Sequence, residues 1–159
     1  MAPNNAWALS QSNSAADAVL GQDDFTHGNP NRDTHGTYEK NLYNPGAVFV
    51  AGGKMFVADR ANSRVLIYNS IPTSNNPTPD VIVGQPDFES NSANQGTAVA
   101  ANTLNQPYGV WSDGTKLIIS DTQNSRVLIY NSIPTTNNAS ANIVIGQTDM
   151  SGSSANQGG

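Results

Sequence analysis

One set of charged and amide side chains occurs twice in this chain with the same spacing. The two sets are Asp59, Asn62 and Arg64, and Asp121, Asn124 and Arg126. Such groups could bind a polar ligand at sites repeated around a ring. The structural alternative is that Asp and Asn cap a turn between two strands, while Arg pairs with a carboxylate or with carbonyls of the next repeat. Because both copies carry the set, we interpret it as part of the scaffold.

In a second repeated motif, one aspartate follows Gly-Gln in each copy. Asp87 and Asp149 occupy this position, and Asp23 and Asp24 follow Gly-Gln near the start of the chain. A calcium site needs six to eight oxygen ligands, which one aspartate per repeat does not supply. We therefore predict that these aspartates cap turns.

Residues for the common enzyme chemistries do not occur in a recognisable frame. The sequence shows no nucleophile–base pair, Gly-rich phosphate loop or framed pair of carboxylates. His27 and His35 are the only histidines and there is no Cys, whereas zinc needs three or four ligands. Nucleic-acid binding needs a basic face, but the net charge is -5. We predict no enzyme activity, no metal, no cofactor and no nucleic-acid partner.

The composition bears on where the protein works. Only 12% of the residues are charged, so Asn, Ser, Thr and Gln must provide most of the polar surface. Such a surface is common on exported bacterial proteins, and we expect an extracellular or periplasmic protein. Met1–Asn5 shows no signal peptide, so any such signal was removed before this sequence begins. No apolar run of membrane-spanning length occurs, and we expect no membrane partner.

The recurring sets belong to a longer repeat with an offset of about 62 residues. From Asp59 to Gly96 against Asp121 to Gly158, roughly 23 of 38 positions are identical, which predicts two copies of one structural unit. A weaker third copy, Ala18–Leu20, matches the last strand of each unit, and Ala6–Leu9 could be a further strand remnant.

Each complete copy reads as four short β segments without helical periodicity. They are 46–50, 54–58, 64–68 and 81–83 in the first copy, and 109–112, 116–120, 126–130 and 143–145 in the second. Gly52, Gly53 and Gly114 supply the positive φ of tight hairpins between the first two segments. Four antiparallel strands per repeat predict an all-β fold of β-propeller blades. A stacked sandwich is the alternative, although it fits the repeat length poorly.

The predicted organisation follows the repeat. A partial blade spans 1–25, a linker with the first full blade spans 26–88, a linker with the second spans 89–150, and a truncated linker spans 151–159.

The run from Pro107 to Val127 resembles the NHL repeat. That pattern is Pro, a Gly-Val strand, Asp-Gly, an apolar strand ending in Asp, and Asn-x-Arg-Val. The run from Pro45 to Val65 matches with departures, because Gly46 replaces Tyr and Ala51-Gly52 replaces Asp-Gly. The resemblance covers nearly the whole chain from Ala18 and implies a propeller of the kind found in long-repeat bacterial NHL proteins. It does not imply one activity, because NHL propellers serve as enzymes, RNA binders and interaction platforms.

A four-strand meander predicts where a ligand would bind. The turns at 59–63 and 121–125 and the linkers 26–44 and 89–106 should lie on one face, and long loops on a rigid scaffold often bind ligands. We expect a protein, peptide or glycan at the mouth of the central channel. The candidate residues are Asn44, Arg60, Gln106, Tyr108 and Gln123. The function predicted is non-enzymatic binding or scaffolding, and the alternative is a propeller hydrolase or lyase with its site at the ring centre.

Two complete blades do not close a propeller, which needs about four to eight. We therefore expect a homo-oligomer: a trimer giving six blades is preferred, and a dimer or tetramer would also close. Phe49 and Trp111 are expected in the core between blades. Ala18–Leu20 is surplus in a ring of two-blade units, and should pair with a neighbouring chain or lie outside the blades.

Overall fold

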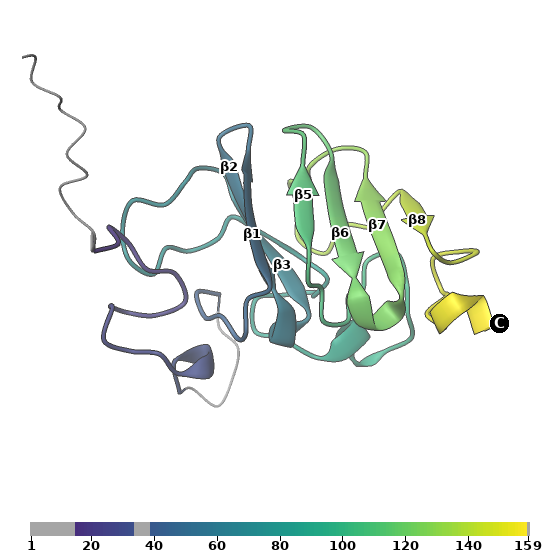
Figure 1. Cartoon of the computed structure of the whole chain (residues 1–159), viewed down its shortest axis with the longest axis horizontal. Helices are drawn as coiled ribbons and strands as arrows, with labels where there is room; N and C mark the ends of the chain where they lie inside the picture. The colour runs from purple at the N-terminus through teal and green to yellow at the C-terminus, as the bar shows by residue number, and fades with distance from the viewer. Residues whose placement is uncertain (1–14, 34–38, 159) are drawn as a thin grey trace, which may run out of the picture.

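The computed structural model describes residues 15–33 and 39–158, and folds as two four-stranded antiparallel sheets (Figure 1). The first sheet contains β1 (Ala47–Ala51), β2 (Lys54–Asp59), β3 (Arg64–Tyr68) and β4 (Val81–Val83). The second contains β5 (Val110–Ser112), β6 (Leu117–Asp121), β7 (Arg126–Tyr130) and β8 (Ile143–Ile145). In both sheets the strands lie side by side in chain order. The predicted all-β class is confirmed.

Among the described residues, helical structure is limited to short 3₁₀ turns. They are η1 (Pro30–Asp33), η2 (Arg60–Asn62), η3 (Ala93–Gly96), η4 (Thr122–Asn124) and η5 (Ala155–Gly158). None of the helices in 15–33 and 39–158 has the length and apolar character needed to cross a membrane. The suggested strand remnant Ala6–Leu9 and the second histidine, His35, lie outside the described residues.

The strand predictions agree with the structure to within one residue at each end. Phe56 of β2, for example, lies opposite Phe49 of β1 and Ile67 of β3. The hairpin turns have the expected backbone, with φ of 58° at Gly52, 75° at Gly53 and 90° at Gly114. Short runs rich in β-branched and aromatic residues, and a Gly that allows positive φ, are both local features, so the sequence predicts the strands and the hairpin turns well.

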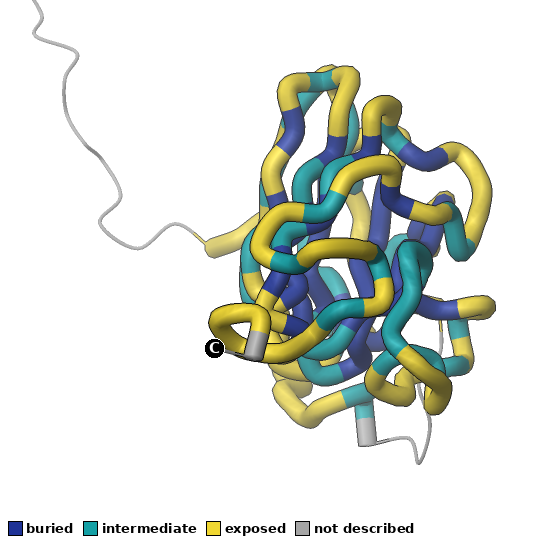
Figure 2. The backbone as a smooth tube through the Cα atoms, turned by 90° about the vertical axis from the view of Figure 1, so that its right-hand side faces the viewer, coloured by how far each residue is buried: buried dark blue, intermediate teal, exposed yellow. Residues whose placement is uncertain are grey.

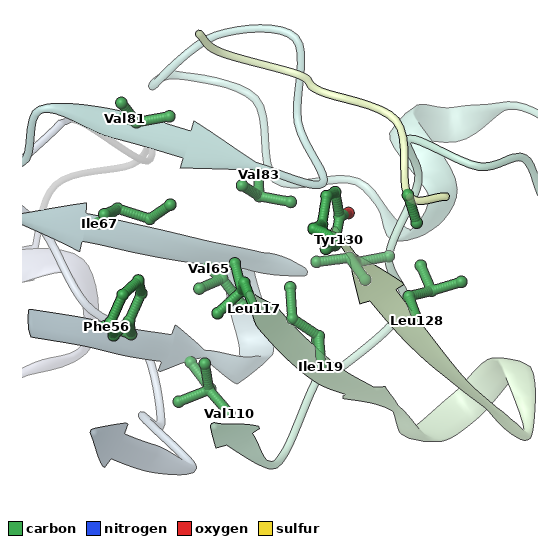
Figure 3. Packing of buried hydrophobic residues seen from close by; sticks show 13 residues of the cluster. Phe56, Val65, Ile67, Val81, Val83, Val110, Leu117, Ile119, Leu128 and Tyr130 are labelled. Atoms are coloured by element: carbon green, nitrogen blue, oxygen red, sulfur yellow. The ribbon is translucent and has the colours of Figure 1, made fainter. Parts of the chain in front are cut away.

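The core lies between the two sheets, which pack face to face. We call the two facing surfaces the inner faces. Figure 3 shows Phe56, Val65 and Ile67 of sheet 1 extending toward Leu117 and Ile119 of sheet 2. All five side chains have no exposed surface, and burying each contributes about 1.5–3 kcal/mol to the free energy of unfolding.

The outer face of sheet 2 carries large apolar side chains that are open to solvent. Figure 2 colours the backbone by burial and shows the buried segments surrounded by exposed loops. Trp111, Ile143 and Ile145 are 46%, 46% and 54% exposed there. The ring of Trp111 lies 6.2 Å from that of Phe49, measured between centroids. Phe49 is partly buried against the core, as expected, whereas the interblade position of Trp111 stays a prediction, because it depends on a neighbouring blade. In the single chain Trp111 is 46% exposed, on a face that no sheet of residues 15–33 and 39–158 covers.

The turns after β2 and β6 lie at the same end of the molecule as the linkers, at the bottom of Figure 1. Ala61 donates its N–H to the Tyr43 carbonyl at 3.0 Å, and Gln123 donates to the Asn105 carbonyl at 3.1 Å. The expected grouping of turns and linkers is therefore confirmed. This end gathers the polar residues considered next.

Candidate functional site

The first repeated polar set forms a buried network beneath η2. Nε of Arg64 donates to Oδ2 of Asp59 at 2.7 Å, and both side chains are completely buried. Asn62 Nδ2 donates to the same oxygen at 2.8 Å. The remaining Arg64 nitrogens donate to the carbonyls of Phe88 at 2.6 Å and Asn41 at 2.7 Å. A single guanidinium thus ties the turn to the two linkers that flank the sheet.

The second set repeats this geometry beneath η4. Arg126 Nε lies 2.7 Å from Asp121 Oδ2, again with both side chains buried. Asn124 Nδ2 donates to that oxygen at 2.8 Å. Arg126 also donates to the carbonyls of Met150 and Thr103, at 2.5 Å and 2.9 Å. These donors and acceptors are engaged within the protein and inaccessible, so the network does not offer a ligand site.

The turn-capping role expected for these aspartates is wrong in its detail. Neither Asp59 nor Asp121 makes a side-chain hydrogen bond that caps its 3₁₀ turn. Their Oδ1 atoms instead accept the backbone N–H of the preceding linker, from Tyr43 at 2.8 Å and Asn105 at 2.7 Å. Oδ2 of each carboxylate accepts from Asn and Arg, so both oxygens are engaged away from the backbone of the turn. They therefore join distant segments and do not stabilise a local turn.

Two further side-chain types complete the scaffold, and the sequence interpretation missed both. Asn31 and Asn62 exchange amide hydrogen bonds of 3.2 and 2.9 Å, and Asn94 and Asn124 do so at 3.2 and 2.8 Å. Gln85, which is buried, donates to the carbonyls of Ser63 at 3.0 Å and Ser92 at 2.9 Å. The recurrence of Ala-Asn-Gln-Gly and Gly-Gln in the sequence was the signal that could have identified them.

Burial sets the titration of the two network carboxyls. Desolvation is the largest effect and raises the pKa of Asp59, against the opposing effect of the Arg64 charge. Desolvation likewise raises the pKa of Asp121, against the Asn105 N–H, Asn124 and Arg126. Because each carboxyl is enclosed by its donors, this shift belongs to the interior of the scaffold and not to an open catalytic cleft.

The turn-capping prediction is confirmed for the exposed aspartates that follow the Gly-Gln motif. Oδ1 of Asp24, Asp87 and Asp149 accepts the backbone N–H of the residue two positions later, at 2.8, 3.0 and 2.8 Å. Asp23 differs, because it pairs with Arg32. No group of three or more His, Cys, Asp or Glu side chains that could hold a metal occurs within 15–33 and 39–158.

Three of the five candidate ligand residues lie together at the turn end. The Arg60 guanidinium lies 5.7 Å from the centroid of the Tyr108 ring, and its NH2 donates to Gln106 Oε1 at 3.3 Å. Tyr108 is 56% exposed, so one face of the cluster is accessible. The Arg60 Nε is buried and has no hydrogen-bond partner among the described residues.

The other two candidates are near this cluster in the chain but are not shown to contact it. Asn44 is exposed with a φ of 54°, two residues before Gly46. Gly46 packs so closely on Tyr108 that a Cβ there would lie 2.8 Å from the Tyr108 carbonyl oxygen. Gln123 is exposed on η4 and makes its backbone bond to Asn105. The structure thus forms a cluster of Arg60, Gln106 and Tyr108, which we call the turn-end cluster.

The internal repeat separates scaffold residues from the turn-end cluster. Arg60 corresponds to Thr122 in the other copy, and Tyr108 corresponds to Gly46, whereas the buried Asp, Asn and Arg are the same in both. The fold can therefore form with quite different side chains at the cluster positions. A guanidinium beside an exposed aromatic ring and an amide can bind a carboxylate, a peptide amide or a sugar hydroxyl.

Neither the known protein families nor the curated proteins include a match to this chain.

Proposed function

We propose that the chain is a non-enzymatic β-propeller module that binds a protein, peptide or glycan and is closed into a ring by several copies. Two sheets of four antiparallel strands in chain order, packed face to face, support the interpretation of each sheet as a blade. The NHL-like sequence motif also supports the interpretation as blades, because its Asp, Asn and Arg form the buried network in both sheets. A location outside the cytoplasm is part of the proposal and rests on the uncharged polar composition.

The observation that carries the binding role is the turn-end cluster. Arg60 follows β2, and Gln106 and Tyr108 precede β5, at the end of the sheets that would surround the mouth of a propeller channel. Their side chains are partly accessible, with Tyr108 exposed and Arg60 and Gln106 half-buried. Thr122 and Gly46 replace Arg60 and Tyr108 in the other repeat, which indicates that folding does not require these two side chains.

The experiment that tests this role is a peptide and glycan array that includes carboxylate-bearing members. Arg60→Ala should weaken binding of the selected ligand about tenfold or more, since a charge-assisted bond is worth about 1.5–3 kcal/mol. Lys54→Ala is the matched control, because it removes one positive charge that contacts Asn69 at the opposite, hairpin end. It should bind like the wild type.

Three results would contradict the binding role. One is a ligand that contacts only the 72–79 side of the sheets. Another is equal loss of binding in both variants. The third is stoichiometric bound metal together with turnover of the ligand, which would favour a hydrolase or lyase.

A further inference from the structure

The contact between the two sheets provides a template for contacts with another molecule. At this junction β4 lies against the second repeat through its backbone. Asn138 donates its N–H to the Ile82 carbonyl at 2.9 Å, and Ile82 donates to Asn137 Oδ1 at 3.1 Å. The template therefore consists of two apolar inner faces and one polar clasp made by an Asn-Asn pair.

By the internal repeat, the outer face of sheet 2 corresponds to the inner face of sheet 1, which sheet 2 already covers. Its apolar residues correspond, in order, to those on the inner face of sheet 1 (Trp111, Ile118, Val127, Ile129, Ile143 and Ile145 against Phe49, Phe56, Val65, Ile67, Val81 and Val83). Phe56, Val65 and Ile67 are fully buried, whereas Ile145 is 54% exposed. The outer face of sheet 2 thus carries side chains of the same kind as the inner face of sheet 1 and differs in having no sheet packed on it within the described chain.

By the same repeat, the outer face of sheet 1 corresponds to the inner face of sheet 2, the surface that covers sheet 1. Met55, Val57 and Leu66 on this face correspond to Leu117, Ile119 and Leu128, which cover the inner face of sheet 1. Val48 and Val50 at its edge are 63% and 48% exposed. The two open faces of one chain are therefore complementary to each other, and they point in opposite directions.

The N-terminal segment Ala18–Leu20 occupies part of the outer face of sheet 1. Asn76 donates its N–H to the Val19 carbonyl at 2.8 Å, and Val19 donates to Asn75 Oδ1 at 3.1 Å. This is the clasp that Asn137 and Asn138 make with Ile82 in the template. Leu20 packs on the outer-face cluster, beside an open apolar hollow of about 390 Å³ that Leu20, Val48 and Met55 line.

We propose that Ala18–Leu20 is an intramolecular cap, and that β8 of a second copy displaces it when chains associate head to tail. Val144, the repeat equivalent of Ile82, then takes the place of Val19 against Asn75 and Asn76. The outer face of sheet 2 is buried on the outer face of sheet 1 in the next chain. Such a heterologous contact closes into a ring if the rotation permits. This inference rests on the proposed assembly of several chains and names the surfaces and the competing segment.

Two single variants and their mixture test the head-to-tail contact. Val48→Lys blocks the outer face of sheet 1, and Ile145→Lys blocks that of sheet 2. Both side chains are more than half exposed, so each variant should fold as a single chain, which circular dichroism would check. By light scattering each variant alone should be monomeric, whereas an equal mixture should form a dimer, because one intact interface remains between the two.

Val19→Pro tests the cap, because it removes the N–H that Asn75 accepts. Loosening the cap should strengthen self-association about tenfold, since a competing closed state reduces apparent affinity by its population. Val19→Pro combined with Ile145→Lys should return the protein to a monomer.

The outcomes separate this inference from the proposed function. If the wild type assembles but Val48→Lys or Ile145→Lys assembles equally well, the contact lies elsewhere and only the inference is wrong. If Val48→Lys alone forms a dimer, the contact joins like faces, and the inference is again wrong. Unchanged or weaker association of Val19→Pro contradicts the cap. If the wild type and Val19→Pro are monomeric at all concentrations, the ring assembly itself is contradicted.

Discussion

At the scale of single residues, a buried guanidinium is the centre of each repeat. Arg64 and Arg126 each bind one carboxylate and two or more carbonyls that come from segments far apart in the chain. The planar fork of Arg suits this task, because it directs several donors at once in fixed directions. The guanidinium compensates the charge of each buried carboxylate. Loss of either partner therefore lowers the stability of the fold, because the other is left buried and unpaired.

The first prediction concerns Arg126→Ala, which should lower the free energy of unfolding by about 3 kcal/mol, because it leaves Asp121 buried without its cation. Chemical denaturation would measure it. Arg32→Ala is the matched control, since it breaks an ion pair whose side chains remain 28% and 56% exposed. It should cost less than about 1 kcal/mol. Equal stability of Arg126→Ala and wild type would contradict the assigned role.

The second prediction concerns acid titration. Hydrogen bonds from the Lys116 and Thr115 N–H groups lower the pKa of Asp113 below its ordinary value of 3.8, whereas burial raises the pKa of Asp121 above it. Asp113 therefore contributes stability that is present above pH 3.8 and is lost as the pH falls through its folded pKa. For Asp121 the sign is opposite: its contribution is present below pH 3.8 and is lost as the pH rises through its folded pKa.

Carboxyl resonances in an NMR titration would check this order. Asp113 should titrate at lower pH than a model peptide and Asp121 at higher pH. The reverse order for the two residues would overturn the assignment.

At the scale of elements, the linkers are fastened to the sheets at positions where the backbone has positive φ. Asn31 and Asn94, whose side chains bond to Asn62 and Asn124, have φ of 47° and 52°. Asn tolerates the left-handed region better than most residues, because its short side chain can hydrogen-bond locally. The abundance of Asn in the linkers thus follows in part from their geometry.

The third prediction compares two equivalent glycines, Gly84 and Gly146, whose φ values are 94° and 93°. Alanine is strained at both, but a Cβ at position 84 would lie 2.5 Å from the buried Leu104 Cδ1, whereas at 146 the nearest atom is the Ser125 carbonyl oxygen at 3.0 Å. Gly84→Ala should therefore cost about 1–3 kcal/mol more than Gly146→Ala, because the core must also shift. Thermal unfolding of the two variants would show the difference. Equal melting temperatures would mean that Leu104 relaxes freely.

At the scale of the whole molecule, the chain has one well-covered junction and two apolar outer faces. The junction buries the inner faces of both sheets, whereas the outer face of sheet 2 keeps large apolar side chains in solvent. Exposed apolar surfaces of this kind mark association sites. The single chain is therefore a unit whose stability should depend on its neighbours.

The fourth prediction is that the melting temperature rises with protein concentration, because binding of the folded chain to further copies favours the folded state by mass action. Differential scanning calorimetry over a hundredfold range of concentration would measure the rise. Ile145→Lys provides the control and should melt at a temperature that does not depend on concentration. A constant melting temperature for the wild type would argue against assembly of folded chains.

The sequence by itself determined the strands, the hairpin turns and the repeat. The run of β-branched, aliphatic and aromatic residues in Arg64–Tyr68 and the positive φ at Gly52 and Gly114 depend on a few neighbouring residues, so both can be read without knowing the rest of the fold. The repeat added that both copies have one architecture. It also placed Arg60, Gln106 and Tyr108 at one end, because a meander of known strand order sets the position of its turns.

Only the tertiary structure decided which distant groups meet. The partner of Asp59 Oδ1 is the Tyr43 N–H and not its own turn, and Trp111 is exposed because neither described sheet covers its face. Val19 bonds to Asn75 and Asn76, more than fifty residues away in the chain. The physical reason is the same in each case. Local conformation depends on neighbouring residues, whereas burial and long-range hydrogen bonds depend on how complete elements pack, and spacing along the chain does not specify that packing.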